Sequence, residues 1–346
     1  MKGNTMSGAP RPRRPSGGPI IDIHAHVLAP SAAALAAKNN PPREPMDFFS
    51  SDATRAVNRQ QGADVREKYT MARLADMDRQ GVDIQVIAPP PGQFYYWAAP
   101  DLGAELARLV NDHLAGFAAE RPDRFRAFGS VPLQSPKHAV AELERCVRVH
   151  GMRGIELCTN VVGEDLSAPR FGDFFASAEA HDVLLFLHPA GFTQGERLTE
   201  NYFSNVLGNP IECTLAIAHF ILGGVLDRHP ALKLYVAHGG GYLPFHAGRM
   251  EHAWHARSDV RASSKMPPSH YLRKNFWWDT VVFDPRSLRH LIDLYGADRV
   301  MLGTDYPFDM GEEDPIGLFH RAGNITREEA EAVLGGNAEG LLRGAT

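Results

Sequence analysis

The stretch Ile20-Ile21-Asp22-Ile23-His24-Ala25-His26 joins an apolar run to two histidines. Residues i and i+2 of a β-strand point to the same face, so His24 and His26 would hold two imidazoles side by side. Paired neutral imidazoles suit a chelated transition metal. The apolar residues predict a buried strand, and the irregular sequence that follows predicts a loop. Because the chain has 16 histidines, other strand ends must decide whether this pair binds metal.

The composition is that of an ordinary soluble globular protein. A chain of 346 residues can bury a large core, either as one α/β barrel or as two smaller domains. A net charge of −5 gives no general attraction to nucleic acid or to an anionic membrane. No apolar run approaches the roughly 20 residues of a membrane helix. We therefore expect neither nucleic acid nor membrane as a partner.

Residues 1–19 are rich in Gly, Pro, Ser and Arg and lack the apolar segment of a secretory signal, which predicts a flexible basic tail. The three cysteines, Cys146, Cys158 and Cys213, are far apart and show no C-x-x-C spacing. Free buried thiols in a reducing cytoplasm are the expected reading.

Short β-branched and apolar runs alternate with amphipathic segments from residue 20 onward. Eight strands, each followed by a helix, predict a (β/α)8 barrel, the TIM-barrel class of α/β fold, spanning 20–346. An open doubly wound sheet is the competing topology, but no G-x-G-x-x-G follows an early strand. The expected strands are 20–26, 83–88, 125–132, 154–159, 183–188, 232–238, 276–280 and 299–305, and the intervening helices include 102–119, 136–150, 170–181, 212–228, 243–255 and 285–295.

An insertion at about 28–69 follows the first strand and fits no helix–strand repeat. Long irregular segments in compact domains are usually functional or disordered. We expect either a lid or small subdomain over the barrel mouth, or disorder.

Further histidines and an aspartate end other predicted strands. His188 ends the fifth, His238 the sixth and Asp305 the eighth. Active sites of such barrels lie at the C-terminal ends of the strands, so these side chains would face one mouth with His24 and His26. Alone, His188 could cap its strand, and Asp305 could form a turn.

Three histidines and one aspartate would hold one divalent cation and leave a position for water or substrate. We predict His24, His26, His188 and Asp305 as the ligands, with Zn²⁺ as the first candidate for the cation and Mn²⁺ as the second. His238 is then the candidate proton carrier, or alternatively a fifth ligand. The Gly239-Gly240-Gly241 run after it suits a tight exit from the strand. Histidines in or beside helical segments are expected to be surface or packing residues: His113, His138, His150, His219, His229, His252 and His255.

The chain resembles the amidohydrolase superfamily, in the branch around α-amino-β-carboxymuconate-ε-semialdehyde decarboxylase and the γ-resorcylate-type decarboxylases. The resemblance runs from about residue 20 to 342. It is carried by Ile21-Asp22-Ile23-His24-Ala25-His26, Met77-Asp78-Arg79-Gln80-Gly81-Val82, Val236-Ala237-His238-Gly239-Gly240-Gly241, Gly248-Arg249 and Leu302-Gly303-Thr304-Asp305-Tyr306-Pro307-Phe308.

The resemblance implies a barrel with one divalent ion, usually zinc and in several relatives manganese. It carries the ligand roles to His24, His26, His188 and Asp305, and the proton-handling role to His238. It also implies a homodimer in which Arg249 reaches the neighbouring subunit's site to hold a substrate carboxylate; packing on its own helix is the alternative. Amidohydrolases that bind two metals carry a carbamylated lysine. The fourth strand here, Gly154-Ile155-Glu156-Leu157-Cys158, has no lysine, so the resemblance favours a single metal.

Two departures from that branch concern the substrate. Its members follow the strand-five His-Pro with Trp-Asp, whereas this chain has His188-Pro189-Ala190-Gly191. Their second carboxylate-binding arginine has no ungapped match here, and Arg59 and Arg66 are the nearest candidates. The aromatic run Phe94-Tyr95-Tyr96-Trp97 would form the apolar wall of the substrate site, Trp97 above all, or else belong to the core.

These features predict a cytoplasmic, metal-dependent decarboxylase with Asp305 and His238 as catalytic residues. Its substrate would be a small unsaturated or aromatic carboxylate with a neighbouring hydroxyl or amino group. The alternative is a hydrolase that uses metal-bound hydroxide on an amide, lactone or C–C bond. A non-enzymatic metal scaffold is the third hypothesis, and an open coordination position beside a free histidine argues against it.

Overall fold

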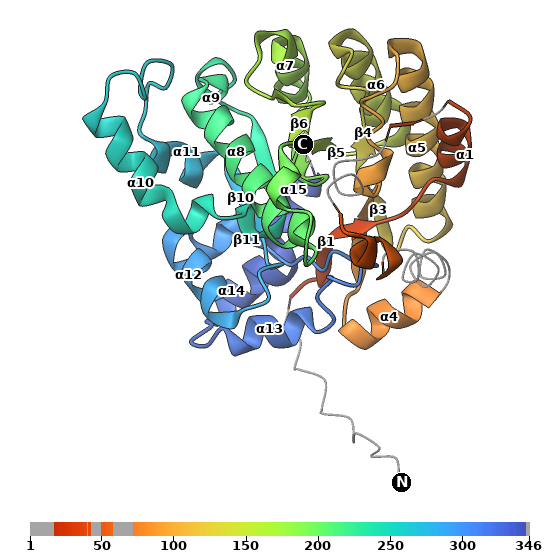
Figure 1. The fold of residues 1–346 in the computed structure, drawn as a ribbon. Helices are drawn as coiled ribbons and strands as arrows, with labels where there is room; N and C mark the ends of the chain where they lie inside the picture. Colours follow the sequence, from red (N-terminus) through yellow and green to blue (C-terminus); the bar gives the residue numbers. More distant parts are fainter. Residues whose placement is uncertain (1–16, 40, 43–49, 58–71, 344–346) are drawn as a thin grey trace.

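The structure is a computed structural model that describes residues 17–39, 41–42, 50–57 and 72–343. Strands occupy the centre and helices surround them (Figure 1). Every pairing between barrel strands is parallel. The predicted (β/α)8 barrel is confirmed.

Eight strand positions build the barrel. Six match the predicted strands within two residues at each end, while the third is split by Phe128 and the eighth, expected at 299–305, covers only Val300–Met301. Around the barrel the strands are β1 (Ile21–His26), β2 (Ile84–Ala88), β3 (Phe125–Ala127) with β4 (Gly129–Ser130), β5 (Gly154–Cys158), β8 (Leu184–His188), β9 (Lys233–Val236), β10 (Phe276–Asp279) and β11 (Val300–Met301). A short hairpin of β6 (Asn160–Val161) and β7 (Glu164–Asp165) extends from β5 and was not predicted.

The seam between β1 and the segment after β11 closes the barrel. Ile23 N–H donates to the Leu302 carbonyl at 2.9 Å, Asp305 N–H to the His24 carbonyl at 2.8 Å, and His26 N–H to the Tyr306 carbonyl at 2.7 Å. Beside them the buried Asp22 carboxylate accepts from the Thr304 hydroxyl at 2.6 Å and from the Thr304 N–H at 3.0 Å. The first and last strands are thereby fixed to each other at the residues that carry the candidate ligands.

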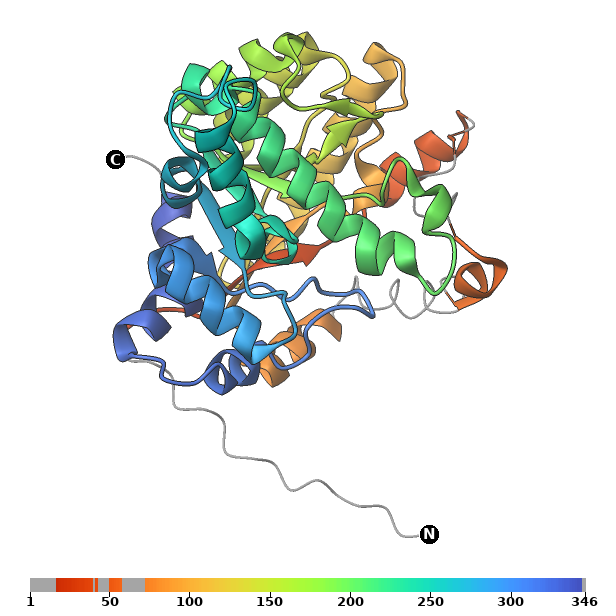
Figure 2. The ribbon, with the colours of Figure 1, turned by 60° about the vertical axis from the view of Figure 1, so that its left-hand side comes forward.

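The helices form the outer layer (Figures 1 and 2). Several begin with proline in the first turn, where its missing N–H costs nothing. They are α1 (Pro30–Ala37), α4 (Ala72–Gln80), α5 (Pro100–Glu120), α6 (Pro136–His150), α7 (Gly172–Ala180), α8 (Asn209–Leu222), α9 (Val225–Arg228), α10 (Leu243–Ala256), α11 (Pro268–Lys274), α12 (Pro285–Tyr295), α13 (Pro315–Arg321), α14 (Arg327–Glu331) and α15 (Asn337–Arg343). The expected helix 212–228 is two helices, α8 and α9, because Gly224 turns the chain with a φ of 70°.

The insertion after β1 is less irregular than its sequence suggested. Residues Pro30–Ala37 form α1, whose Ala32 and Ala36 are buried, and residues 52–57 are also helical. Alanine-rich sequence favours helix. The proline and asparagine pairs nearby were given more weight in the sequence, and no helix was predicted here. Residues 40, 43–49 and 58–69 of the insertion, and residues 1–16 of the expected tail, lie outside the described residues.

Two apolar clusters fill the protein. The larger packs the helices onto the barrel. The smaller lines the interior, where Phe186 stacks on Tyr235 with ring centroids 4.4 Å apart. Phe186 precedes His188 by two residues on β8 and therefore faces the same way. This floor lies directly beneath the strand ends, and His24 contacts the Phe186 ring edge-on at 5.0 Å.

One helical run, Ser204–Leu222, is long and apolar enough by length and composition to span a membrane, contrary to the expectation from the sequence. It comprises a π-helical turn, Ser204–Gly208, and α8. Within the fold 44% of its apolar window is buried, and Cys213, Ile217 and Phe220 belong to the larger cluster. Its hydrophobicity is that of a helix that covers a barrel.

Thr304→Val tests the seam. The change leaves the buried Asp22 carboxylate without a donor that lies 2.6 Å away. We expect the free energy of unfolding to fall by about 1–3 kcal/mol in urea denaturation. Thr214→Val is the control, because the Thr214 hydroxyl donates to the Pro210 carbonyl and accepts from the Tyr242 N–H at an exposed place, where water can replace it. Its loss of stability should be below about 1 kcal/mol. Equal losses in the two variants would argue against a special role for the seam.

Candidate metal centre

The predicted ligands come together at the C-terminal mouth of the barrel. The imidazoles of His24 and His26 have ring centroids 5.2 Å apart, and each lies about as far from His188, at 5.1 and 5.0 Å. Asp305 Oδ1 lies 3.3 Å from His24 Nε2 and 3.2 Å from His26 Nε2. Side chains from β1, from β8 and from the segment after β11 therefore lie close together at the mouth of the barrel.

Each of the three imidazoles is oriented by its other ring nitrogen. His24 Nδ1 bonds Asp279 Oδ2 at 2.7 Å, His26 Nδ1 the Pro89 carbonyl at 2.9 Å, and His188 Nδ1 the Pro189 carbonyl at 2.8 Å. A carbonyl can only accept, so Nδ1 carries the proton in His26 and His188, and Nε2 presents a lone pair. This is the usual outer support of metal-bound histidine.

The converging atoms have no hydrogen-bond partner. His24 Nε2, His26 Nε2, His188 Nε2 and Asp305 Oδ1 are all buried and unsatisfied among the described residues. Burying four such atoms without partners would cost several kcal/mol. Three neutral imidazole nitrogens and one carboxylate oxygen are a donor set that fits a divalent cation. The residues present therefore fit a metal ion.

His238 borders this group. His24, His188, His238 and Asp305 can each offer a ligand atom within 4.8 Å of the others. His238 Nε2 lies 3.5 Å from Asp305 Oδ2, and the side chain is 15% exposed, more than the three other histidines. Both alternatives for His238, proton carrier and fifth ligand, are compatible with this position.

A second group, His26, Glu156 and His188, shares His188 with the first. Each His188 ring nitrogen can serve one partner, and Nδ1 already bonds a carbonyl. Neither oxygen of the fully buried Glu156 has a partner, and burial raises the pKa of this carboxyl well above its usual range. Because both groups would need the one free ring nitrogen of His188, the arrangement favours one cation.

The charges of the group depend on His24. Burial alone would lower its pKa, but the carboxylates of Asp305 and Asp279 outweigh burial and raise the pKa of His24 to about 10. Burial lowers the pKa of His26, and burial with the neighbouring imidazoles lowers that of His188 far below its usual value. Although burial acts to raise it, the pKa of Asp305 is held well below its usual range, chiefly by His24.

Asp279 was missed in the sequence. It ends β10 and accepts hydrogen bonds from His24 Nδ1, from the Tyr235 hydroxyl at 3.1 Å and from the N–H groups of His238 and Gly239 at 3.1 and 2.8 Å. The rule that active-site residues end barrel strands applies to it equally. An acceptor that supports a ligand, however, has no spacing signal of its own.

The glycine run after β9 has the expected role. His238, Gly239, Gly240 and Gly241 all have φ between 57° and 79°. A Cβ on Gly241 would lie 2.2 Å from the Pro210 carbonyl oxygen. Only glycine fits this turn, which brings His238 back over the barrel mouth.

A cavity of about 370 Å³ opens beside His238 and Asp305. Its wall is mostly apolar, with Asn205, Asn209 and Ser287 as neutral polar groups. Apart from His238, Asp305 and Tyr242, none of the described lining side chains ionises. The apolar lining consists of Val206, Pro210, Phe245, Val281, Val282, Phe283 and Met310.

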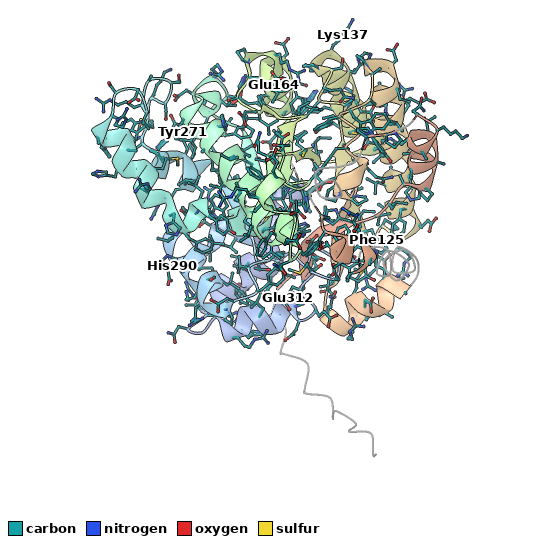
Figure 3. The ribbon with its side chains drawn as sticks, in the orientation of Figure 1. Phe125, Lys137, Glu164, Tyr271, His290 and Glu312 are labelled. Carbon is teal, nitrogen blue, oxygen red and sulfur yellow. The ribbon has the colours of Figure 1, made fainter. Side chains whose placement is uncertain are left out.

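The predicted substrate contacts are not gathered there. Arg249 is exposed on α10, and Trp97 is half-buried and packs against the larger apolar cluster. Phe94, Tyr95 and Tyr96 are buried in that cluster, as in the core alternative. Arg59 and Arg66 lie outside the described residues. The three cysteines are free and buried, as expected. Not every histidine belongs to the site: His290, for example, lies at the outer edge of the molecule (Figure 3).

Known proteins resemble nearly the whole chain. A family model described as "Amidohydrolase" matches residues 21–344. A 2-amino-3-carboxymuconate-6-semialdehyde decarboxylase of Dictyostelium discoideum is 39% identical, covering 77% of this chain and 74% of that protein. A γ-resorcylate decarboxylase of a Rhizobium species is 31% identical over 68% and 76% of the two chains. The structure of 5-carboxyvanillate decarboxylase from Sphingomonas paucimobilis superposes with a TM-score of 0.83 at 26% identity, covering 94% of this chain and 99% of that one.

Metal binding should release a proton. With a pKa of about 10, His24 is protonated in the metal-free protein at neutral pH, so the cation must displace that proton. Below pH 10 we expect the apparent affinity for Mn²⁺ to rise about tenfold per pH unit. Calorimetric titration in buffers of different ionisation enthalpy measures the release, expected to be about one proton at pH 7.5.

Asp279→Asn is the companion variant, because it removes one of the carboxylates that raise the pKa of His24. We expect less proton release and an affinity that is about 10–100-fold weaker. Release of no proton by the unmodified protein would contradict the charge assignment. Asp284→Asn, which alters an exposed helix cap, should change neither quantity.

Proposed function

Because this chain belongs to the amidohydrolase family, we propose that it is a metal-dependent decarboxylase of small unsaturated or aromatic carboxylates. The observation that carries the proposal is the set of three unsatisfied Nε2 atoms and one carboxylate oxygen at the barrel mouth, beside the cavity that His238 borders. The relatives named decarboxylases support the reaction type.

The ligand set is His24, His26, His188 and Asp305. A divalent cation held there would bind the carboxylate and a neighbouring oxygen of the substrate and withdraw electron density from them. All four residues are buried. Zn²⁺ is our first candidate and Mn²⁺ the second, because imidazole and carboxylate suit both.

His238 moves the proton. It is the histidine that reaches both the ligand group and the cavity, so a substrate in the cavity lies beside its ring. Protonation of the carbon that bears the carboxylate gives that carbon four single bonds. The C–C bond to the carboxylate then breaks, its electron pair restores the double bond or aromatic ring, and CO₂ leaves. Asp305, 3.5 Å from His238 Nε2, holds the imidazole in place and can relay the proton.

The cavity favours a largely apolar substrate body. Its described wall offers two carboxamides and the hydroxyls of Tyr242 and Ser287, but no lysine or arginine of the same subunit. We propose that the chain forms a homodimer and that the exposed Arg249 of each protomer serves the site of the other, since guanidinium matches a carboxylate. Three free thiols fit a cytoplasmic protein.

The test of the reaction is CO₂ release by Mn²⁺- or Zn²⁺-loaded protein from a panel of o-hydroxybenzoates and muconate semialdehydes. Release from at least one member is expected, without incorporation of labelled water oxygen. No release from any member would overturn the decarboxylase assignment. Incorporated label would instead indicate the hydrolase.

His238→Asn separates the two roles of this residue. If His238 is a proton carrier, the substitution should lower kcat about 10²–10⁴-fold. Elemental analysis should still find one metal ion per subunit. Loss of the metal would make His238 a ligand. His252→Asn, on the outer helix α10, is the control and should leave both measurements unchanged.

Arg249→Ala tests the contribution across the dimer. We expect KM to rise at least tenfold for a substrate with a second carboxylate and little for a monocarboxylate, because only the former needs a second cationic partner. Hybrid dimers can then pair an Arg249→Ala protomer with an inactive His238→Asn protomer that keeps Arg249. If Arg249 acts in trans, the site with the intact His238 should regain the KM of the unmodified protein. Unchanged KM values for both substrates would exclude Arg249 from the site.

A further inference from the structure

Arg73 is buried completely, at 0% exposure, and lies in α4 beneath the mouth of the barrel. Arginine is almost never fully buried unless its charge is compensated. Its surroundings therefore indicate what the charge is for.

The guanidinium reaches the strand that carries the histidine pair. Arg73 Nη2 donates to the carbonyl of His26 at 2.5 Å, and Nη1 donates to Gln85 Oε1 at 2.9 Å. The guanidinium carbon lies 4.6 Å from the centroid of the Tyr306 ring, a cation–π distance. Arg73 thus contacts the proposed ligand residue His26 directly, and it contacts Tyr306, which follows the proposed ligand Asp305 in the sequence.

Gln85 extends the contact to a countercharge. Its amide nitrogen donates to Asp22 Oδ2 at 2.9 Å. Asp22 Oδ1 also accepts the His24 N–H at 3.0 Å and the Thr304 N–H at 3.0 Å. One positive and one negative buried group are joined through a single carboxamide, and the backbone at His24, His26 and Thr304 lies within this chain of bonds.

We propose that Arg73 is a positioning residue of the metal centre, holding His26 by its carbonyl and, through Gln85 and Asp22, holding β1 against the segment that carries Asp305. The inference rests on the metal site of the proposed function. Arg73 touches neither substrate nor metal and acts through the ligands. A rotation of the His26 peptide would swing its imidazole away from the common point, so the fixed carbonyl fixes the donor.

A purely structural role would give a different result. An arginine that only joins α4 to the barrel would affect stability and leave the affinity for metal unchanged. Arg124 provides that comparison, because it donates to the Asp83 carbonyl at 2.8 Å, the Val82 carbonyl at 3.2 Å and Asp78 at 2.8 Å. These contacts join the start of β3 to α4 and to the residues before β2, at the opposite end of the barrel from the ligands.

The experiment compares Arg73→Met, Arg73→Lys and Arg124→Met in the full chain. Chelator competition measures the dissociation constant for Mn²⁺ without substrate, so the outcome does not depend on whether decarboxylation is found. Urea denaturation measures stability in parallel, and the electron paramagnetic resonance spectrum of bound Mn²⁺ reports the symmetry of its ligands.

For Arg73→Met we expect the dissociation constant to rise about 10–100-fold and the spectrum to change. Arg73→Lys, which keeps the charge but not the two-pronged contact, should recover part of the affinity. Arg124→Met should bind within twofold of the unmodified protein. A folded Arg73→Met with unchanged affinity and spectrum overturns the proposal, as does an equal loss in Arg124→Met. If Arg73→Met does not fold, unchanged affinity in Arg73→Lys has the same meaning.

Discussion

The candidate metal centre depends on the hydrogen bonds that close the barrel between its first and last strands. His24 and Asp305 are 281 residues apart, yet Asp305 N–H bonds the His24 carbonyl, and their side chains meet within 3.3 Å. Bringing such distant residues together carries a loop-closure cost that the rest of the barrel has already met. The two histidine ligands of the seam, His24 and His26, therefore need only their rings to be oriented. The hydrogen bonds of their Nδ1 atoms to Asp279 and to the Pro89 carbonyl do this.

The buried carboxylates around this seam have different roles. Asp22 and Asp279 each accept several hydrogen bonds and fix backbone, whereas Glu156 accepts none from the described residues and burial raises its pKa well above the usual range. A buried anion is stable when donors surround it and costly when they do not. Asp305 differs from all three, because its Oδ1 faces the imidazoles and His24 chiefly holds its pKa well below the usual range. Asp22 and Asp279, whose oxygens are satisfied by protein donors, hold the frame, and Asp305 is available to a cation.

The sequence carried enough information for the barrel and for the residues at its mouth, because both follow from short-range periodicity. His26, His188 and Asp305 could be placed at the barrel mouth from apolar runs and a rule of barrel topology, although the last strand itself ends at Met301. Asp279 could have been found in the same way, but its role as a hydrogen-bond acceptor leaves no pattern. Arg73 was hidden for another reason: a charged residue on an amphipathic helix normally predicts exposure. Its burial follows from Gln85 and Asp22, which only the fold brings near.

The two histidines that end β1 and the one that ends β9 differ in a way that matches their proposed roles. His24 and His26 lie in regular strand, fully buried, with Nδ1 engaged. His238 has a φ of 57°, retains some exposure and leaves Nδ1 without a partner among the described residues. Left-handed backbone at a non-glycine residue is costly and persists where the surroundings impose it; here the Asp279 carboxylate holds the His238 N–H. A ligand benefits from rigidity on every side, whereas a residue that passes a proton needs one free face. The strained turn gives His238 that face while keeping its ring beside Asp305.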